Sequence, residues 1–442
     1  MSKIAVIPLG HEDYKGESLT LLLNETEKRL ADAGIVYPGI QTVATTSESA
    51  VSLCREARCE GFDGFVLFLA SWIECRVVMS ALLELEGLPV MLWGTTMIEV
   101  GGKNVNTGSY VSAAMLSGVV KRLALPCKCL IGSCQDPGTI GEILTFAKVS
   151  SAIKALRYST VGLIGYTSMG IYTGTFDHLF MRYHIGPEID HMDAYTLINY
   201  AQKYGAEAIS NAENELRAVA RLNEKIDKAA VGRTLALYLA MKEICGEYKW
   251  DALNIKCQYE LSKEYKTVPC VAISLLADQG IITSCEGDML ITVSMMILRY
   301  ISGQTVTYGD AINHYKDTNT VKFSACGFLP FSMGAGERLV RNFMEHPGFS
   351  GIQTSFVMRP ERVTFLRLVE DTGSYHLVYG TGQGLQTGLR DGCMPALDVR
   401  LDGKLEDFVS AYAGQHYAIC YGDCSAELEM FAGLKGIKTV RV

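Results

Sequence analysis

The first part of the chain alternates between short apolar runs and longer amphipathic segments. The first two runs are separated by residues 17–34, which have helical periodicity and end at Gly34. Alternation of this kind favours a parallel sheet covered by helices. We therefore predict a Rossmann-like α/β domain over residues 1–150. The apolar runs, each typical of a buried strand, span residues 3–10, 62–70, 88–94 and 127–135.

A second domain of the same class is predicted over residues 151–345. Residues 158–183 have the pattern of a strand, a glycine-containing turn and a helix, and residues 211–230 form a polar helical segment. Apolar runs at 252–257 and 269–276 predict further strands. Two Rossmann-like domains with parallel sheets therefore make up most of the chain.

The pattern changes from about Gly351, where short strands with alternating polarity follow one another with turns between them. Residues 354–371 and 374–382 carry this alternation, and an αβ segment that starts at His416 closes the chain. The pattern is typical of an antiparallel β-barrel or sandwich. We predict a C-terminal β-barrel domain over residues 346–442.

Composition narrows the function. The chain has 442 residues, 48% of them apolar and 20% charged, which indicates a globular protein of several domains. A net charge of −8 argues against a nucleic-acid partner, and no apolar run of about 18 residues predicts a membrane span. The 14 cysteines are scattered and the N-terminus has no export signal, so we expect free thiols in the cytoplasm.

Two kinds of motif are excluded. The glycine-containing stretches "GLIGYTSMG" and "GTGQGLQTG" do not fit a nicotinamide site, because the first lacks the GxGxxG spacing and the second lies in the β-rich region. The histidines His178, His184 and His191 lie near a predicted helix, but their spacing does not suit a metal-binding face.

Acidic residues flank an apolar, helix-like run. Glu286 and Asp288 precede the run and Asp310 follows it. Burying a carboxylate beside such a run costs several kcal/mol unless it is paired. Glu286 follows a strand, so it lies at the edge where parallel strands deliver functional groups, and a helix and turn can return Asp310 to that edge. Two carboxylates and an imidazole such as His416 suit Mn²⁺, Mg²⁺ or Fe²⁺. A helix cap and a loop acid would explain the same spacing, which leaves both readings open.

A resemblance to a known family favours the metal site. The segments "SWIECRVVMS", "LPVMLWG", "GSYVSAAM" and "LIGSCQDP", then "LRYSTVGLIGYTSMGIYTGTFDHLF", "CEGD" and "GQHYAICYGDCSAEL", follow in the order and at the spacing of the L-fucose isomerase family. The members of this family are metal-dependent aldose–ketose isomerases, related also to L-arabinose isomerase. The match covers most of the chain.

The resemblance implies three metal ligands, Glu286, Asp310 and His416, with Mn²⁺ as the expected metal. Glu286 and Asp310 are also the expected catalytic pair, which moves a proton between C1 and C2 of an open-chain sugar by way of a cis-enediol. Asp288 is left as a supporting or helix-capping residue. Relatives of the arabinose type use an additional histidine, and its region here contains Ala325, which points to the three-ligand site of the fucose type.

The resemblance also suggests how a sugar is held. Trp72 is expected to form an apolar wall against the sugar, although a plain core tryptophan is the alternative, and Gln415 is expected to contact a hydroxyl. L-Fucose and related neutral sugars are the first expectation. Shortened members of the family act on sulfoquinovose, a glucose with a sulfonate at C6, and this chain ends soon after His416. Sulfoquinovose is therefore the second expectation, with Arg76 as the cation for the sulfonate.

The same resemblance implies a homo-oligomer, a hexamer or a related form, with sites near the subunit interfaces. A small-molecule sugar is the expected partner. Two other classes of function stay open: a sugar-binding protein without catalysis, and a metal-dependent aldolase or hydrolase with similar ligands.

Overall fold

The computed structural model describes residues 3–35, 42–344 and 349–442. The chain divides into two compact units. The first unit comprises Met1–Lys154 and Ala426–Ile437, and the second comprises Ala155–Ser425 and Lys438–Val442. The division into three domains over 1–150, 151–345 and 346–442 stays a prediction, and its boundary at 345–346 lies outside the described residues.

The first unit contains the predicted parallel sheet. Its strands pair in the order β1-β2-β3-β6, and every pairing is parallel. All residues of the two neighbouring strands β1 and β2 are buried, as expected for a sheet covered on both faces. The strands are β1 (Ile4–Leu9), β2 (Gly64–Leu69), β3 (Val90–Gly94) and β6 (Lys128–Ile131), with a hairpin of β4 (Ile98–Val100) and β5 (Lys103–Val105). The helices are α1 (Glu17–Asp32), α2 (Ser47–Cys59), α3 (Cys75–Glu84) and α4 (Ser109–Leu123), while α5 (Pro137–Tyr158) and α13 (Ser425–Lys435) each extend into the second unit.

The second unit contains another parallel sheet, which confirms the α/β prediction for this region. Its order is β11-β10-β7-β8, and neighbouring strands are again parallel. The order places β10 and β11 side by side, so the residues that follow these two strands meet at one edge. The strands are β7 (Thr160–Ile164), β8 (Glu188–Met192), β10 (Ala252–Ile255) and β11 (Ile282–Cys285).

Of two element predictions in this unit, one is wrong and the other is confirmed only in part. Residues 269–276 were expected to form a strand, but Cys270–Asp278 form helix α10, which is buried from Cys270 to Ala277. A short run that is apolar on every side has no period that distinguishes a strand from a buried helix. Residues 211–230 do not form one helical segment either, because α8 ends at Val219 and α9 begins at Lys228. The helices are α6 (His178–His184), α7 (Ala194–Ala201), α8 (Ala206–Val219), α9 (Lys228–Tyr248), α10, α11 (Met289–Ser302) and α12 (Leu405–Ser410).

A seven-stranded sheet follows later in the chain, and it is mainly antiparallel, as the sequence predicts. Its order is β16-β19-β12-β13-β18-β17-β20, and among the described residues only the pairing of β17 with β20 is parallel. A three-stranded sheet has the order β15-β14-β9. The strands are β9 (Arg221–Leu222), β12 (Thr307–Tyr315), β13 (Thr320–Ser324), β14 (Leu339–Asn342), β15 (Ile352–Ser355), β16 (Arg362–Asp371), β17 (Ser374–Leu385), β18 (Ala396–Leu401), β19 (His416–Tyr421) and β20 (Lys438–Arg441).

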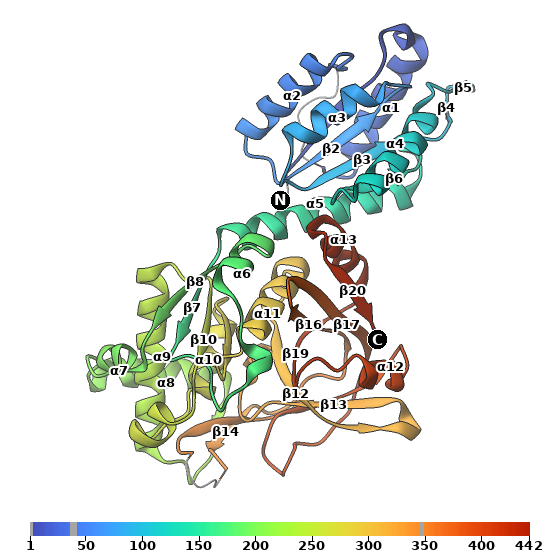
Figure 1. Ribbon diagram of the computed structural model, residues 1–442. Coiled ribbons are helices and arrows are strands. Elements are labelled where there is room, and N and C mark those ends of the chain that lie inside the picture. The colour runs from blue at the N-terminus through green and yellow to red at the C-terminus, as the bar shows by residue number, and fades with distance from the viewer. Residues whose placement is uncertain (1–2, 36–41, 345–348) are drawn as a thin grey trace. The chain divides into compact units, whose positions relative to one another are not determined.

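Helix α11 joins the parallel sheet and the seven-stranded sheet of the second unit. It packs against β10 and β11 of the parallel sheet and against β16 and β19 of the antiparallel sheet (Figure 1). Its residues are buried on every side from Met289 to Leu298, as is typical of a core helix. The start of α11 therefore lies where the edges of both sheets meet.

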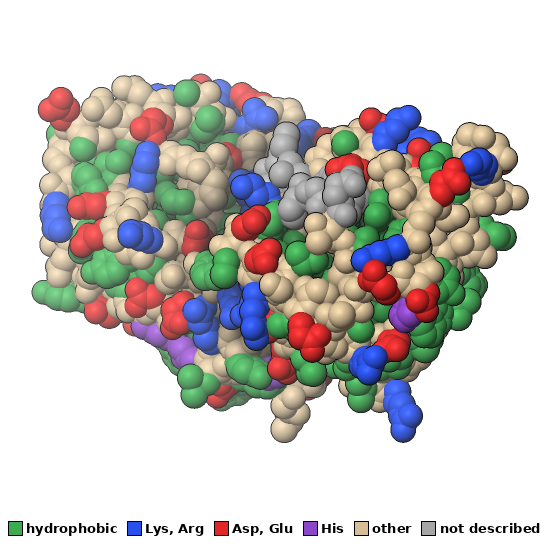
Figure 2. Space-filling model, turned by 90° about the horizontal axis from the view of Figure 1, so that it is seen from above, with side chains coloured by type: hydrophobic (Ala, Val, Ile, Leu, Met, Phe, Trp, Pro, Cys, Tyr) green, Lys and Arg blue, Asp and Glu red, His purple; other side chains and the backbone are tan. Residues whose placement is uncertain are grey.

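The distribution of charged side chains on the surface agrees with the net negative charge of the sequence. On the face shown in Figure 2, lysine and arginine side chains are interspersed with acidic ones rather than gathered into one basic area.

Within the described ranges, no helix is long and apolar enough to cross a membrane. No disulfide joins the cysteines, all of which lie in the described part of the chain.

Candidate metal centre

The centre begins at a tight turn after strand β11. Glu286 has φ of 69° and Gly287 has φ of 70°, so two successive residues adopt the left-handed conformation. The Glu286 amide donates to the Ile255 carbonyl at 3.0 Å, and the Glu286 carbonyl accepts from the Ser168 amide at 2.9 Å. A non-glycine residue held in this conformation by its neighbours is typical of functional sites. The turn places Glu286 at the carboxyl edge of the parallel sheet, as predicted.

The buried side-chain amide of Asn254 supports the turn. Asn254, on the neighbouring strand β10, accepts the Gly287 amide at 2.8 Å and donates to the Asp288 carbonyl and to the Ser284 hydroxyl, each at 2.9 Å. Asn254 is fully buried, and a satisfied polar network of this kind is rigid. Hydrogen bonds from within the protein therefore hold the turn in place.

Asp288 has two roles, one for each of its oxygens. Its Oδ1 accepts the Ile291 amide at 3.0 Å and caps α11, which confirms the capping interpretation of this residue. Its Oδ2 lies 2.8 Å from His416 Nδ1 and 3.1 Å from Arg367 Nη1. Asp288 is fully buried, so both contacts are made out of water.

Asp310 and His416 come from neighbouring strands of the antiparallel sheet. Strand β12 pairs with β19 so that these two residues are directly opposite each other. The register breaks just beyond Asp310, between Ala311 and Asn313, where β12 pairs with β13. Strand pairing thus brings an acid and an imidazole together although they are far apart in the sequence.

The three predicted ligands converge on one ring nitrogen. His416 Nε2 lies 3.2 Å from Asp310 Oδ1 and 3.5 Å from Glu286 Oε2. The nitrogen is buried, and it has no hydrogen bond of acceptable geometry to any described residue. Nδ1 is engaged by Asp288, so a neutral ring with its proton on Nδ1 directs the Nε2 lone pair toward the two carboxylates. A buried ring nitrogen without a partner, facing two acids, fits a divalent cation.

Arg367 balances the buried charge. This side chain is fully buried, and it donates to the His416 carbonyl at 3.0 Å and to the Thr173 carbonyl at 2.6 Å as well as to Asp288. Burial opposes the charge on Asp288, but Arg367 and His416 outweigh it, so the pKa of Asp288 lies below its usual range. Asp288 therefore stays ionised, and its negatively charged carboxylate holds the imidazole ring.

The pKa of His416 shifts in the opposite direction to that of Asp288. Burial lowers the pKa of an imidazole, but here the nearby carboxylates of Asp288, Asp310 and Glu286 outweigh burial and raise the pKa of His416 well above its usual value. Without a cation, the ring therefore binds a proton among the three acids. A divalent cation held by Nε2, Glu286 and Asp310 would supply positive charge in place of that proton.

The other predicted site residues are placed as follows. Gln415 lies next to His416, and its Oε1 accepts from the Thr173 hydroxyl at 3.3 Å. Trp72 belongs to the first unit, where it is half-buried with its ring 5.2 Å from the His11 ring. Arg76, also in the first unit, has a side chain that is 79% exposed and forms an ion pair with Glu74. The assignment of these three residues to a sugar stays a prediction.

Sequence reasoning missed two parts of the centre. Arg367 lies in an alternating apolar strand, where a charged residue at a buried position is itself a signal. Cys257 and Cys285 form a group with Glu286, and the ligand atoms of all three lie within 4.8 Å of one another. Among the histidines that were set aside, His178 and His191 lie with their Nε2 atoms 2.5 Å apart.

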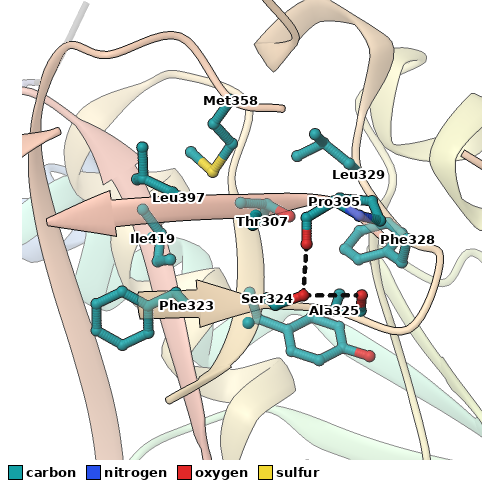
Figure 3. Close-up of a pocket in the computed structure, with 13 residues that line it drawn as sticks. Thr307, Phe323, Ser324, Ala325, Phe328, Leu329, Met358, Pro395, Leu397 and Ile419 are labelled. Carbon is teal, nitrogen blue, oxygen red and sulfur yellow. Dashed lines mark hydrogen bonds between the residues drawn. The ribbon is translucent and has the colours of Figure 1, made fainter. Parts of the chain in front are cut away.

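A second feature near the centre is apolar and does not resemble a sugar site. Figure 3 shows a pocket among strands of the antiparallel sheet, lined by Ala325, Phe323, Phe328 and Met358, in which the Ser324 hydroxyl bonds the carbonyls of Ala325 and Pro395. Among the described residues, no carboxylate or histidine lines it. Ala325 thus points to a packed interior and provides no metal ligand.

Comparison with known proteins gives relatives over the full length. No protein-family model matches the chain. A sulfoquinovose isomerase of Alkalicoccus urumqiensis is 21% identical, with 100% of both chains covered. A sulfoquinovose isomerase of Priestia megaterium is 23% identical over 99% of this chain and 98% of its own, and one of a Clostridium species is 22% identical over 78% and 79%. A solved glucose-galactose binding protein of Geobacillus stearothermophilus matches 69% of this chain and 92% of its own at 12% identity, with a TM-score of 0.18, which is too low to support a shared fold.

Proposed function

We propose, from the premise that this chain is a full-length relative of sulfoquinovose isomerases and so of the L-fucose isomerase-like family, that it is a metal-dependent aldose–ketose isomerase. The observation that supports this best is the buried Nε2 of His416, which has no hydrogen-bond partner among the described residues and faces Glu286 and Asp310. These three residues would hold the cation, and Mn²⁺ fits two carboxylates and an imidazole.

The chemistry is divided between the cation and the protein. A bound divalent cation supplies Lewis-acid polarisation of sugar oxygens. Glu286 and Asp310 both lie near the same imidazole nitrogen, so one carboxylate could take the C2 proton of the open-chain sugar while the site returns a proton to C1. Asp288 and Arg367 hold the imidazole in place and keep the charge of the site balanced.

Sulfoquinovose is the proposed substrate. Neutral sugars such as L-fucose were the first expectation from the sequence, but four relatives carry the name sulfoquinovose isomerase and favour the second one. The product would be the corresponding ketose, which keeps its sulfonate at C6. Arg76 is proposed to bind the sulfonate, Trp72 to form an apolar wall and Gln415 to contact a hydroxyl.

Several finer properties belong to the same proposal. We propose that the protein acts in the cytoplasm as a homo-oligomer, a hexamer or a related form, with sites near subunit interfaces. We also propose that the antiparallel sheet forms a barrel. The additional pairing of β16 with β17 supports this, because it links two strands from opposite parts of the sheet order.

The test is a comparison of specificity constants. Purified protein with Mn²⁺ is assayed on sulfoquinovose and L-fucose, and the product is identified by mass and by nuclear magnetic resonance. An isomerase gives a ketose of unchanged mass and favours sulfoquinovose. Cleavage of the sugar would indicate an aldolase or hydrolase, and binding without turnover would indicate a sugar-binding protein.

Matched variants connect the activity to the residues. Glu286→Gln, Asp310→Asn and His416→Ala should each lower Mn²⁺ affinity, kcat or both. The control is Asp317→Asn, which changes an exposed acid in the same unit. Full activity of one of these three variants would show that the substituted residue is not part of the centre. If Arg76→Ala leaves the preference for sulfoquinovose unchanged, Arg76 does not bind the sulfonate.

A further inference from the structure

A second set of metal donors shares one residue with the centre. Cys285 is the last residue of β11 and precedes Glu286, and Cys257 follows the end of the neighbouring strand β10. The two thiol sulfurs and a Glu286 oxygen lie within 4.8 Å of one another. Cys257 is 6% exposed and Cys285 is 5% exposed, so the two sulfurs are buried beside the carboxylate.

The spacing of these atoms suits a tetrahedral cation. Zinc binds sulfur at about 2.3 Å and carboxylate oxygen at about 2.1 Å, so tetrahedral ligands lie about 3.5–3.8 Å apart. Atoms already within 4.8 Å of one another reach that spacing through small side-chain movements. The strands limit any larger movement, because Ile255 pairs with Cys285 in the parallel sheet.

The donor types differ between the two sets. Glu286, Asp310 and His416 offer two oxygens and one nitrogen, whereas Cys257, Cys285 and Glu286 offer two sulfurs and one oxygen. Thiolates select soft or borderline cations, and Mn²⁺ is the weakest binder among the divalent first-row metals. The thiol set should therefore prefer Zn²⁺, and the imidazole set remains suitable for Mn²⁺.

We propose that Cys257, Cys285 and Glu286 form a binding site for a thiophilic divalent cation such as Zn²⁺. Each thiol releases its proton to the solvent as its bond to the metal forms, and no redox step is involved. Tyr308 Oη lies 2.9 Å from Cys285 Sγ and can donate to the resulting thiolate. The Glu286 carboxylate cannot serve both sets in full, so Zn²⁺ draws it away from Asp310 and His416 and inhibits the enzyme. Only this inhibition rests on the proposed function.

Cobalt provides a readout that does not depend on activity. The full-length protein is titrated with Co²⁺, and thiolate ligation is followed by the near-ultraviolet sulfur-to-cobalt charge-transfer absorption. Wild-type protein and His416→Ala should both show the band, because the imidazole is not part of the thiol set. Cys257→Ser and Cys285→Ser should lose it. Cys245→Ser is the matched control, because Cys245 is a buried cysteine of the same unit on α9.

The results separate this inference from the proposed function. Absence of the band in folded wild-type protein overturns the thiol site. A band in wild type without any isomerase activity supports the site and contradicts only the proposed function. Cys257→Ala, checked for folding by circular dichroism, serves as a second variant if the serine variants unfold. Retention of the band in this variant also overturns the site.

Inhibition is measured with Mn²⁺ in excess. Each variant is compared with its own activity before zinc is added, so that changes in basal rate cancel. The zinc concentration for half inhibition should rise at least about tenfold in Cys257→Ala, because loss of even an outer-shell partner of a metal site costs about 10–100-fold in affinity. An unchanged sensitivity to Zn²⁺ would show that zinc inhibits by another route and would overturn the regulatory part.

Discussion

At the scale of single residues, the two nitrogens of His416 have different surroundings. Nδ1 faces the carboxylate of Asp288 at 2.8 Å, and Nε2 faces Asp310 and Glu286 without a hydrogen bond of acceptable geometry. A carboxylate behind a metal-binding histidine sets the ring's tautomer and orientation and raises its basicity. The position of His416 therefore depends as much on Asp288 as on the two proposed ligands.

Metal binding should depend on pH through His416. The pKa of His416 is raised well above its usual value, so without metal the ring is protonated at neutral pH, whereas a metal requires the neutral form. Mn²⁺ affinity should increase as pH rises toward that raised pKa, with release of about one proton per metal. Calorimetry in buffers of different ionisation enthalpy measures this proton count. His314→Gln, which removes an exposed histidine of β12, is the control, and a pH-independent affinity would contradict the prediction.

Asp288→Asn should weaken the centre without removing a proposed ligand. Loss of the carboxylate behind a metal-binding histidine costs about 10–100-fold in metal affinity. The change also leaves Arg367 buried without a counter-charge, which costs about 3–5 kcal/mol of stability. Calorimetric titration with Mn²⁺ and urea unfolding measure the two effects. Asp278→Asn is the control, because Asp278 accepts the Phe331 amide at 2.8 Å, outside the centre. Wild-type metal affinity in Asp288→Asn would refute the positioning role.

At the scale of elements, the turn between β11 and α11 decides where Glu286 lies. Its two left-handed residues are held by the buried Asn254 amide and by the backbone of Ser168. Glycine suits the second position for a further reason, since a Cβ on Gly287 would lie 2.3 Å from the Tyr166 carbonyl oxygen. The turn therefore combines a conformational requirement with a steric one.

Alanine substitutions at both ends of α11 separate these two requirements. Gly303, just after the helix, has φ of 70° like Gly287, but its Cβ would meet nothing within 4 Å. Gly303→Ala should cost about 1–2 kcal/mol of unfolding free energy from the left-handed conformation alone. Gly287→Ala should cost more and should also lower Mn²⁺ affinity, because the clash displaces Glu286. Equal losses of stability with unchanged metal affinity in both variants would show that the turn does not position Glu286.

At the scale of the whole molecule, the second unit contains all three proposed metal ligands, whereas Trp72 and Arg76 belong to the first. Exposed apolar side chains remain on the second unit: Leu179 and Tyr183 are each 83% exposed and are one helical turn apart on α6. Side chains four residues apart lie on the same face of a helix, so this pair offers apolar area for contact with another subunit.

We expect a homo-oligomer of the 48.4 kDa chain. Sedimentation equilibrium at several concentrations should give a multiple of that mass. The double variant Leu179→Glu, Tyr183→Glu should lower the average mass if these residues contribute to subunit contacts, because it places charges in an apolar interface. An active wild-type monomer would contradict the prediction. An unchanged average mass of the variant would show that this face of α6 is not part of a subunit contact.

The sequence alone determined the elements with a strong period and the kinds of ligand that the chain offers. Alternating strands and amphipathic helices predicted parallel sheets followed by a mainly antiparallel one, because burial on one or both faces leaves a local pattern. The strand prediction for residues 269–276 is wrong because a fully buried helix leaves no such pattern. Tertiary structure alone decided that Asp310 pairs with His416, that Arg367 lies against Asp288, and that two cysteines lie beside Glu286. Strand register and side-chain packing join residues far apart in the chain, and no local period records such contacts.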